Sequence, residues 1–130
     1  MIGLDTTAII DLFKGDPRIK SCLEENKEPL ASTHINYLEL LFGIDTSIQA
    51  HRDEKTYYDD LFSELTVLPL DETACKTAAD IFWALNRKGE TIGKFDSIIG
   101  GILLAHGVSR VITRNVKHFE GIPGMKVIPY

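Results

Sequence analysis

The sequence has little cysteine, no long hydrophobic run and no excess of positive charge. Its two cysteines, Cys22 and Cys75, stand far apart without a CxxC or Cys/His pattern, which argues against a zinc site and predicts buried thiols in a reducing cytoplasm. No apolar segment approaches the roughly 18 residues that a membrane span needs, so no membrane partner is expected. The N-terminus lacks a basic region followed by an apolar one, so no secretion signal is predicted.

The charge balance also limits the choice of partner. The net charge is −5, from 19 acidic and 14 basic residues. A protein that binds nucleic acid through charge alone is normally basic. A polyanionic partner would therefore have to be attracted by bound cations or by a local basic rim. The length of 130 residues and the 44% share of hydrophobic residues fit a single soluble domain, residues 1–130, with one sizeable core.

Short apolar segments alternate with helical patterns along the whole chain. Strands are expected at 2–4, 29–32, 66–70, 109–113 and 125–130, and helices at 6–13, 17–26, 34–44, 53–65, 71–89 and 94–107. Thr33 and Asp71 are predicted helix caps, and Pro17 suits the first position of the second helix. This alternation predicts a three-layer α/β/α fold with a central parallel sheet.

Asp5 ends the first expected strand, and two interpretations fit it. As a cap of the helix that follows, it would accept hydrogen bonds from free backbone N–H groups. As a binding or catalytic group, it would lie at the carboxyl end of a parallel strand, where open α/β sheets bind ligands. The segment Thr113–Asn115 follows a later strand and falls at the same edge. The position of the other acids decides between these interpretations.

Two further acids are hard to place by composition alone. Glu39 belongs to a helix that is apolar on most of its circumference, so it either points to water or is buried with a partner or a metal ion. Asp96 begins another helix, where it would interact favourably with the helix dipole or serve as a ligand. Gly100 and Gly101 are unfavourable inside that helix, and close packing on the sheet is the expected compensation, which would fix the position of Asp96.

Considered together, these side chains indicate a site for a hard cation. Asp5, Glu39, Asp96 and Asn115 offer only oxygen ligands, which suit Mg²⁺ or Mn²⁺. One or two such ions can orient water and stabilise the charge that develops on a phosphate being cleaved. The ions would also overcome the unfavourable net charge, because they neutralise the acids and attract phosphate.

Four segments carry a resemblance to a known family. "LDTTAIIDLF", "THINYLELLFG", "IGKFDSIIGGILLAHG" and "VITRNVKHFEGIPG" resemble, in order and spacing, the successive blocks of the PIN domain, and especially VapC-type toxins of toxin–antitoxin systems. The resemblance runs from Ile2 to Met125. It implies an endoribonuclease in which Asp5, Glu39 and Asp96 bind Mg²⁺ or Mn²⁺, with in-line attack by water leaving a 5′-phosphate.

The same resemblance assigns roles to neighbouring residues. Thr6 and Thr113 match hydroxyl positions that support the acids. Asn115 occupies a fourth position that is often Asp in the family, and an amide brings no charge, so a second metal ion would be held more weakly. This departure leaves open an alternative function, a PIN-like module that binds RNA or protein without cleaving.

Candidate partners complete the prediction. Arg114, Lys117 and Lys94 are candidate contacts for RNA phosphates, although for each of them a solvated surface charge is the simpler interpretation. His118 is expected at the surface and outside the mechanism, since metal-assisted hydrolysis needs no histidine base. The family implies a homodimer and a VapB-type antitoxin. The apolar residues that could serve these interfaces, or simply the core, are Leu12, Phe13, Tyr57, Tyr58, Phe62 and Trp83.

Overall fold

The computed structural model describes residues 1–130 as five strands and seven helices. The strands are β1 (Ile2–Leu4), β2 (Leu30–Thr33), β3 (Thr66–Leu68), β4 (Arg110–Ile112) and β5 (Lys126–Ile128). The helices are α1 (Thr6–Phe13), α2 (Pro17–Glu25), α3 (His34–Phe42), α4 (Gln49–Glu64), α5 (Glu72–Arg87), α6 (Lys94–Ala105) and α7 (Val116–Phe119). Every predicted strand is present, at slightly different bounds.

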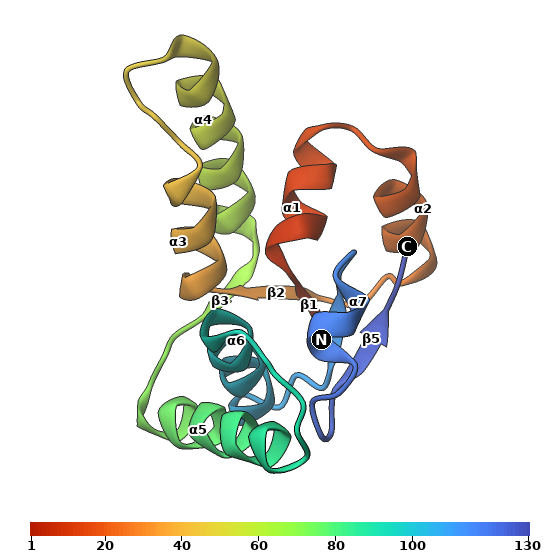
Figure 1. Cartoon of the computed structure of the whole chain (residues 1–130). Helices are drawn as coiled ribbons and strands as arrows, with labels where there is room; N and C mark the ends of the chain where they lie inside the picture. The colour runs from red at the N-terminus through yellow and green to blue at the C-terminus, as the bar shows by residue number, and fades with distance from the viewer.

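The strands form one parallel sheet in the order β3-β2-β1-β4-β5 (Figure 1). The chain builds outward from β1 through β2 to β3, then returns to the other side of β1 for β4 and β5. Gly3 in β1 is therefore in register with Ala31 of β2 on one side and Val111 of β4 on the other. In open α/β sheets, ligands bind in the crevice that forms where the winding direction changes, here between the carboxyl ends of β1 and β4.

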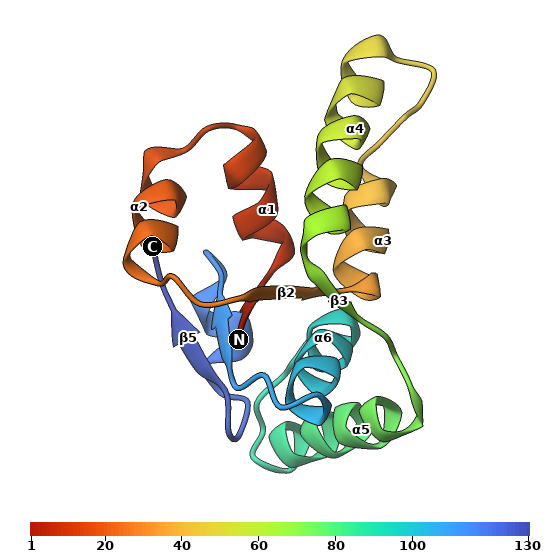
Figure 2. The ribbon, with the colours of Figure 1, turned by 180° about the vertical axis from the view of Figure 1, so that it is seen from behind.

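Helices cover both faces of the sheet, because successive strand residues point to opposite sides. Leu4 and Ile112 belong to a core cluster that includes residues of α1, α2 and α4. Ala31 and Val111 belong to a second cluster that includes residues of α5 and α6. Figures 1 and 2 show α1, α2, α3 and α4 on one side and α5 and α6 on the other. The predicted three-layer α/β/α fold is confirmed.

Helix α6 is fixed by close packing against α5. A Cβ atom on Gly101 would lie 2.6 Å from both the backbone nitrogen and the Cβ of Ala78, so only glycine fits there. Gly100 faces the flexible end of Ile122. The prediction that this glycine pair packs on the sheet was therefore wrong, since its partners are α5 and the segment before β5. The close helix contact nevertheless gives α6, and Asp96 in its first turn, a defined place.

The predicted helix caps and helix bounds can be compared with the helix ends in the structure. Asp71 accepts a hydrogen bond from the Ala74 N–H (2.8 Å) and Thr33 accepts one from the Asn36 N–H (3.1 Å), so both predicted caps are confirmed. Helix α4 begins four residues earlier than expected, at Gln49. Helix α7 was not predicted, because four residues are too few to show helical periodicity.

Several apolar side chains and one thiol remain at the surface. Tyr58 and Phe62 are buried in the core, whereas Phe13, Tyr57 and Trp83 are 37%, 37% and 55% exposed. Both cysteines are free, but only Cys22 is buried. The expectation of two buried thiols was wrong for Cys75, which is exposed on α5 and lines an apolar groove. None of the helices combines the length and the apolar composition that crossing a bilayer requires.

Candidate active site

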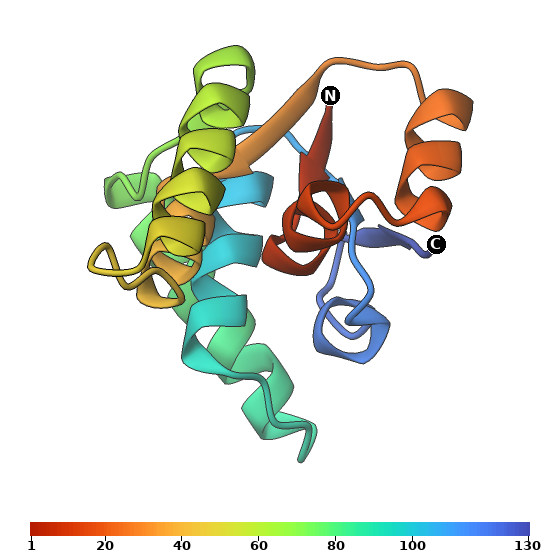
Figure 3. The same cartoon turned by 90° about the horizontal axis from the view of Figure 1, so that it is seen from above.

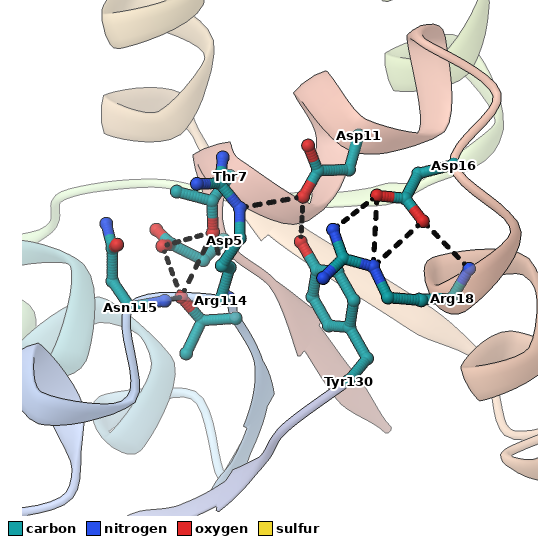
Figure 4. Close-up of polar contacts among 9 residues, drawn as sticks. Asp5, Thr7, Asp11, Asp16, Arg18, Arg114, Asn115 and Tyr130 are labelled. Carbon is teal, nitrogen blue, oxygen red and sulfur yellow. Dashed lines mark hydrogen bonds and ion pairs between the residues drawn. The ribbon is translucent and has the colours of Figure 1, made fainter.

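Asp5 stands at the N-cap position of α1, but its side chain does not cap the helix. Its Oδ1 accepts a hydrogen bond from Asn36 Nδ2 (3.1 Å), and its Oδ2 accepts one from Thr113 Oγ1 (2.7 Å). Thr7 Oγ1 also donates to Oδ2, at 3.4 Å (Figure 4). The capping interpretation of Asp5 is therefore wrong. The residue is 4% exposed, and all of these partners are neutral, so its negative charge is not balanced by a cation.

Asn36 fixes the orientation of this carboxylate, and sequence reasoning missed it. The residue is fully buried in the first turn of α3. Its Oδ1 accepts from Thr33 Oγ1 (2.8 Å), so its amide group must face the other way, where it donates to Asp5 and to Thr6 Oγ1 (3.0 Å). Asn36 precedes Glu39 by three residues, which places both on one face of the helix. That spacing was the signal available in the sequence.

Glu39 reaches the same region from the next turn of α3. Thr6 Oγ1 donates a hydrogen bond to its Oε1 at 2.7 Å. Burial raises the pKa of the Glu39 carboxyl, the Thr6 hydrogen bond opposes that rise, and the charges of Asp5 and Asp96 raise it further. Glu39 is therefore partly buried with a hydrogen-bond partner and does not simply point to water, while the supporting role of Thr6 stays a prediction.

Asp96 completes the set from the first turn of α6. Its side chain is 21% exposed, and Oδ2 lies 3.0 Å from His118 Nδ1. Burial raises the pKa of the Asp96 carboxyl, the neighbouring His118 lowers it, and the charge of Asp5 raises it. His118 lies at the surface, as expected, and its side chain contacts Asp96. Gly93 allows this arrangement, because a Cβ there would lie only 3.2 Å from Asp96 Oδ2.

The three acids come from distant parts of the chain and lie close enough around the carboxyl end of β1 to affect one another electrostatically. Each of Glu39 and Asp96 is affected electrostatically by Asp5, and Glu39 also by Asp96. Figure 3 shows α3 and α6, which carry the last two acids, side by side. No group of three or more His, Cys, Asp or Glu side chains is arranged to enclose a metal ion. An all-oxygen donor set of this kind fits a hydrated Mg²⁺, which is commonly bound through one or two carboxylates and several waters.

The segment after β4 supports Asp5 from the opposite side. Thr113 is fully buried, donates to Asp5 and accepts a hydrogen bond from the Asn115 backbone N–H at 3.0 Å. Thr113 is thus in direct contact with Asp5, and its supporting role stays a prediction. Figure 4 shows Asn115 beside the Asp5 carboxylate, as expected for a residue that follows the adjacent strand.

The three predicted RNA contacts lie in different surroundings. Arg114 donates through Nε to Asp11 Oδ2 (3.0 Å), so its guanidinium is directed to α1. Lys94 lines the apolar groove between α5 and α6 and lies two residues, about 200° of helix, from Asp96. Lys117 is exposed and lines hollows of 350 and 450 Å³ that both include His118. Of the three, Lys117 is the one that shares a hollow with His118, whose side chain contacts Asp96.

Comparison with known proteins agrees with this geometry. The family model of the PIN domain matches residues 2–123. The chain is 30% identical to the tRNA(fMet)-specific endonuclease VapC of Salmonella typhimurium, over 95% of this chain and 93% of that protein. It is 31% identical to the VapC ribonuclease Y4jK of Sinorhizobium fredii, over 98% and 96%. A DNA-bound VapBC structure from Salmonella typhimurium superposes with a TM-score of 0.83 at 27% identity, over 98% and 96% of the two chains. The protein therefore belongs to the PIN-domain family and, within it, to the VapC proteins.

Proposed function

We propose that this protein is a metal-dependent endoribonuclease that acts as the toxin of a toxin–antitoxin pair. The observation that carries the proposal is the electrostatic proximity of Asp5, Glu39 and Asp96 around the carboxyl end of β1, with Asp5 held by neutral donors alone. The relatives named as an endonuclease and a ribonuclease support cleavage over the alternative of a non-cleaving binding module.

In this proposal the three acids hold Mg²⁺ or Mn²⁺, and the Asn115 side chain adds an uncharged oxygen. An ionised carboxylate has about four acceptor positions. Asp5 accepts three hydrogen bonds and Glu39 accepts one, so both keep oxygen lone pairs for an ion. When bound, one or two divalent ions lower the pKa of water and stabilise the charge that develops on the cleaved phosphate.

The remaining residues of the site orient the carboxylates or attract the phosphates of the RNA. Asn36 and Thr113 hold the Asp5 carboxylate from two sides, and Thr6 holds that of Glu39. Lys117 is the best-placed cation for an RNA phosphate, which would give affinity without sequence preference. Arg114 is already paired with Asp11, and Lys94 faces another groove, so their proposed contacts with RNA have less support.

The direct test is cleavage of single-stranded RNA by the purified protein. We expect cleavage with Mg²⁺ or Mn²⁺, none in EDTA, and products that carry a 5′-phosphate. The variant Asp5→Asn should lose at least about a hundredfold in rate, because electrostatic stabilisation at the reacting phosphate disappears, while its circular dichroism spectrum is unchanged. The matched control is Asp80→Asn, an exposed carboxylate of α5, which should cleave normally. Full activity of Asp5→Asn, or cleavage in EDTA, would contradict the proposal.

We further propose a VapB-type antitoxin as partner and a homodimer as the assembled form. Solved relatives include VapBC complexes, and the exposed Phe13, Tyr57 and Trp83 supply apolar surface for such contacts. The two free cysteines are compatible with a cytoplasmic location. Light scattering on the purified chain tests the dimer directly, and a monomer at micromolar concentration would contradict it.

A further inference from the structure

A second buried carboxylate lies next to the candidate site and has no part in the proposed chemistry. Asp11, in the second turn of α1, is 5% exposed. Its Oδ2 accepts hydrogen bonds from Arg114 Nε (3.0 Å) and from the Tyr130 hydroxyl (2.6 Å) (Figure 4). A carboxylate this buried needs such partners, because an unpaired charge in the interior is strongly unfavourable.

These contacts connect three segments that are remote in sequence. Asp11 belongs to α1, Arg114 to the segment after β4, and Tyr130 to the segment after β5. The Arg114 backbone N–H donates to Thr7 Oγ1 at 3.1 Å, so side chain and main chain of the same residue are both attached to α1. The segment that carries Thr113 is therefore fixed at several points within a few residues of Asp5.

The hydrogen bonds continue directly to the acid. The Asn115 N–H donates to Thr113 Oγ1 (3.0 Å), and Thr113 Oγ1 donates to Asp5 Oδ2 (2.7 Å). Thr7 Oγ1, which accepts from the Arg114 N–H, lies 3.2 Å from Thr113 Oγ1 and 3.4 Å from Asp5 Oδ2. Any movement of Arg114 consequently changes the two hydroxyl groups that hold Asp5.

We propose that Asp11 and Tyr130 are positioning residues for the candidate active site. They hold the Arg114 side chain against α1, and the Arg114 main chain in turn fixes Thr113 and Asn115 beside Asp5. This inference rests on the proposed nuclease function. It assigns Arg114 a role in positioning and leaves binding of RNA phosphate to other cations.

Tyr130 is suited to this role over a wide pH range. Burial raises the pKa of its hydroxyl, and the hydrogen bond to Asp11 raises it further, so the group remains a donor. Because Asp11 Oδ2 accepts from both Tyr130 and Arg114, loss of the hydroxyl leaves Arg114 as the one remaining donor to that oxygen. The Tyr130 hydroxyl also contacts the Arg114 side chain, so its loss removes one of the contacts that hold this half-exposed side chain in place.

The experiment compares Tyr130→Phe with a matched control, Tyr58→Phe. Tyr58 also donates its hydroxyl to a carboxylate, that of Glu54 (2.6 Å), but this contact lies within α4. The first readout is amide hydrogen exchange at Arg114 and Asn115 in the metal-free protein. We expect exchange to accelerate about tenfold in Tyr130→Phe, because local opening becomes easier, and to remain unchanged in Tyr58→Phe.

The second readout is the affinity for Mn²⁺, measured by electron paramagnetic resonance, and the third is RNA cleavage. Tyr130→Phe should weaken Mn²⁺ binding several-fold and lower kcat about tenfold with little change in KM, since small displacements of reacting groups strongly affect rate. Arg114→Lys keeps the positive charge but not the guanidinium geometry, so it should reproduce the loss of kcat.

Several outcomes overturn the inference. One such outcome is that Tyr130→Phe changes neither the amide hydrogen exchange nor the Mn²⁺ affinity. Another is that Tyr130→Phe raises KM alone, which would indicate that Arg114 contacts RNA. Full activity of Arg114→Lys would likewise show that its charge suffices. If the unmodified protein neither cleaves RNA nor binds Mn²⁺, the proposed function fails instead, and the exchange rates alone then decide whether Tyr130 positions the segment.

Discussion

Two carboxylates, Asp5 and Asp11, are equally buried at the two ends of one short helix but are stabilised in opposite ways. Asp5 accepts hydrogen bonds only from amide and hydroxyl groups, whereas Asp11 is paired with the Arg114 guanidinium and a phenol. The Arg114 guanidinium neutralises the negative charge of Asp11 through a direct ion pair. The neutral donors at Asp5 orient the carboxylate and leave its charge available, which is what a cation-binding group requires.

The neighbours of each carboxylate strengthen the contrast. Around Asp5 stand two further acids, Glu39 and Asp96, whose pKa values are raised by burial and by the nearby negative charges. Next to Asp11, by contrast, the fold itself places the positive charge of Arg114. A buried charge thus marks a binding site only when its own fold does not neutralise it, and the identity of the donors distinguishes the two cases.

The largest expected effect on stability comes from removing the side-chain amide of Asn36, the neutral donor to Asp5. Asn36→Leu deprives Asp5 and the hydroxyls of Thr33 and Thr6 of a partner in a fully buried place. We expect a loss of about 3 kcal/mol in the free energy of unfolding, measured with urea in EDTA. Arg114→Met should cost only about 1 kcal/mol, because that side chain is half-exposed and water can replace it. A larger loss for Arg114→Met would show that the ion pair, and not the amide, dominates stability here.

A second comparison of the two carboxylates measures how much Mg²⁺ stabilises the folded protein when either one is replaced. Mg²⁺ at about a hundred times its Kd should stabilise the unmodified protein by roughly 2.7 kcal/mol, as for any ligand that binds only the folded state. Asp5→Asn should abolish this stabilisation, because a ligand is lost. Asp11→Asn should retain most of it, although the variant starts from a lower stability. Thermal unfolding with and without Mg²⁺ measures the stabilisation in each variant. An equal rise of the unfolding temperature on adding Mg²⁺ to the two variants would show that the carboxylates do not differ in this way.

The smallest effect concerns pH and the repulsion among the three acids. Glu39 has a raised pKa when folded, so above its ordinary value of 4.5 the folded state holds the proton longer than the unfolded state does. Stability without metal should therefore fall as pH rises through that window. Glu39→Gln removes this contribution, so its stability relative to the unmodified protein should increase with pH above about 4.5.

Urea unfolding in EDTA at several pH values gives that difference. The control is Glu24→Gln, an exposed carboxylate of α2 that is remote from the acids. A difference that is flat or shrinks with rising pH would mean that burial and the neighbouring acids do not raise the pKa of Glu39 in the folded protein.

Local signals in the sequence were sufficient for most of the fold. The apolar strands and the caps Thr33 and Asp71 depend on residues close in sequence, so they could be predicted, whereas the order of the strands in the sheet was not predicted. The meeting of Asp5, Glu39 and Asp96 followed from the rule that strand ends share an edge, together with the family resemblance. Helix α7 and the partners of Gly101 were missed, because neither produces a local pattern.

The direction of charged side chains could not be predicted in the same way. Arg114 looked like a contact for RNA, yet it pairs with a residue 103 positions earlier, and the third member of that cluster lies 119 positions from Asp11. Contacts over such separations depend on the completed packing of the sheet. Asn36 was missed for a related reason, since an amide in a helix gives no sign of being buried until its three partners are in place.

The strand order has a consequence for when the protein becomes dangerous to its host. Because β4 pairs with β1 but follows β2 and β3 in the chain, the candidate site is completed by parts of the chain that are synthesised late. A nascent polypeptide that has emerged only as far as α5 already contains the first two acids but has no Asp96 and no Thr113. We expect such a fragment to be harmless, which gives a co-produced inhibitor time to fold before the catalytic pocket exists.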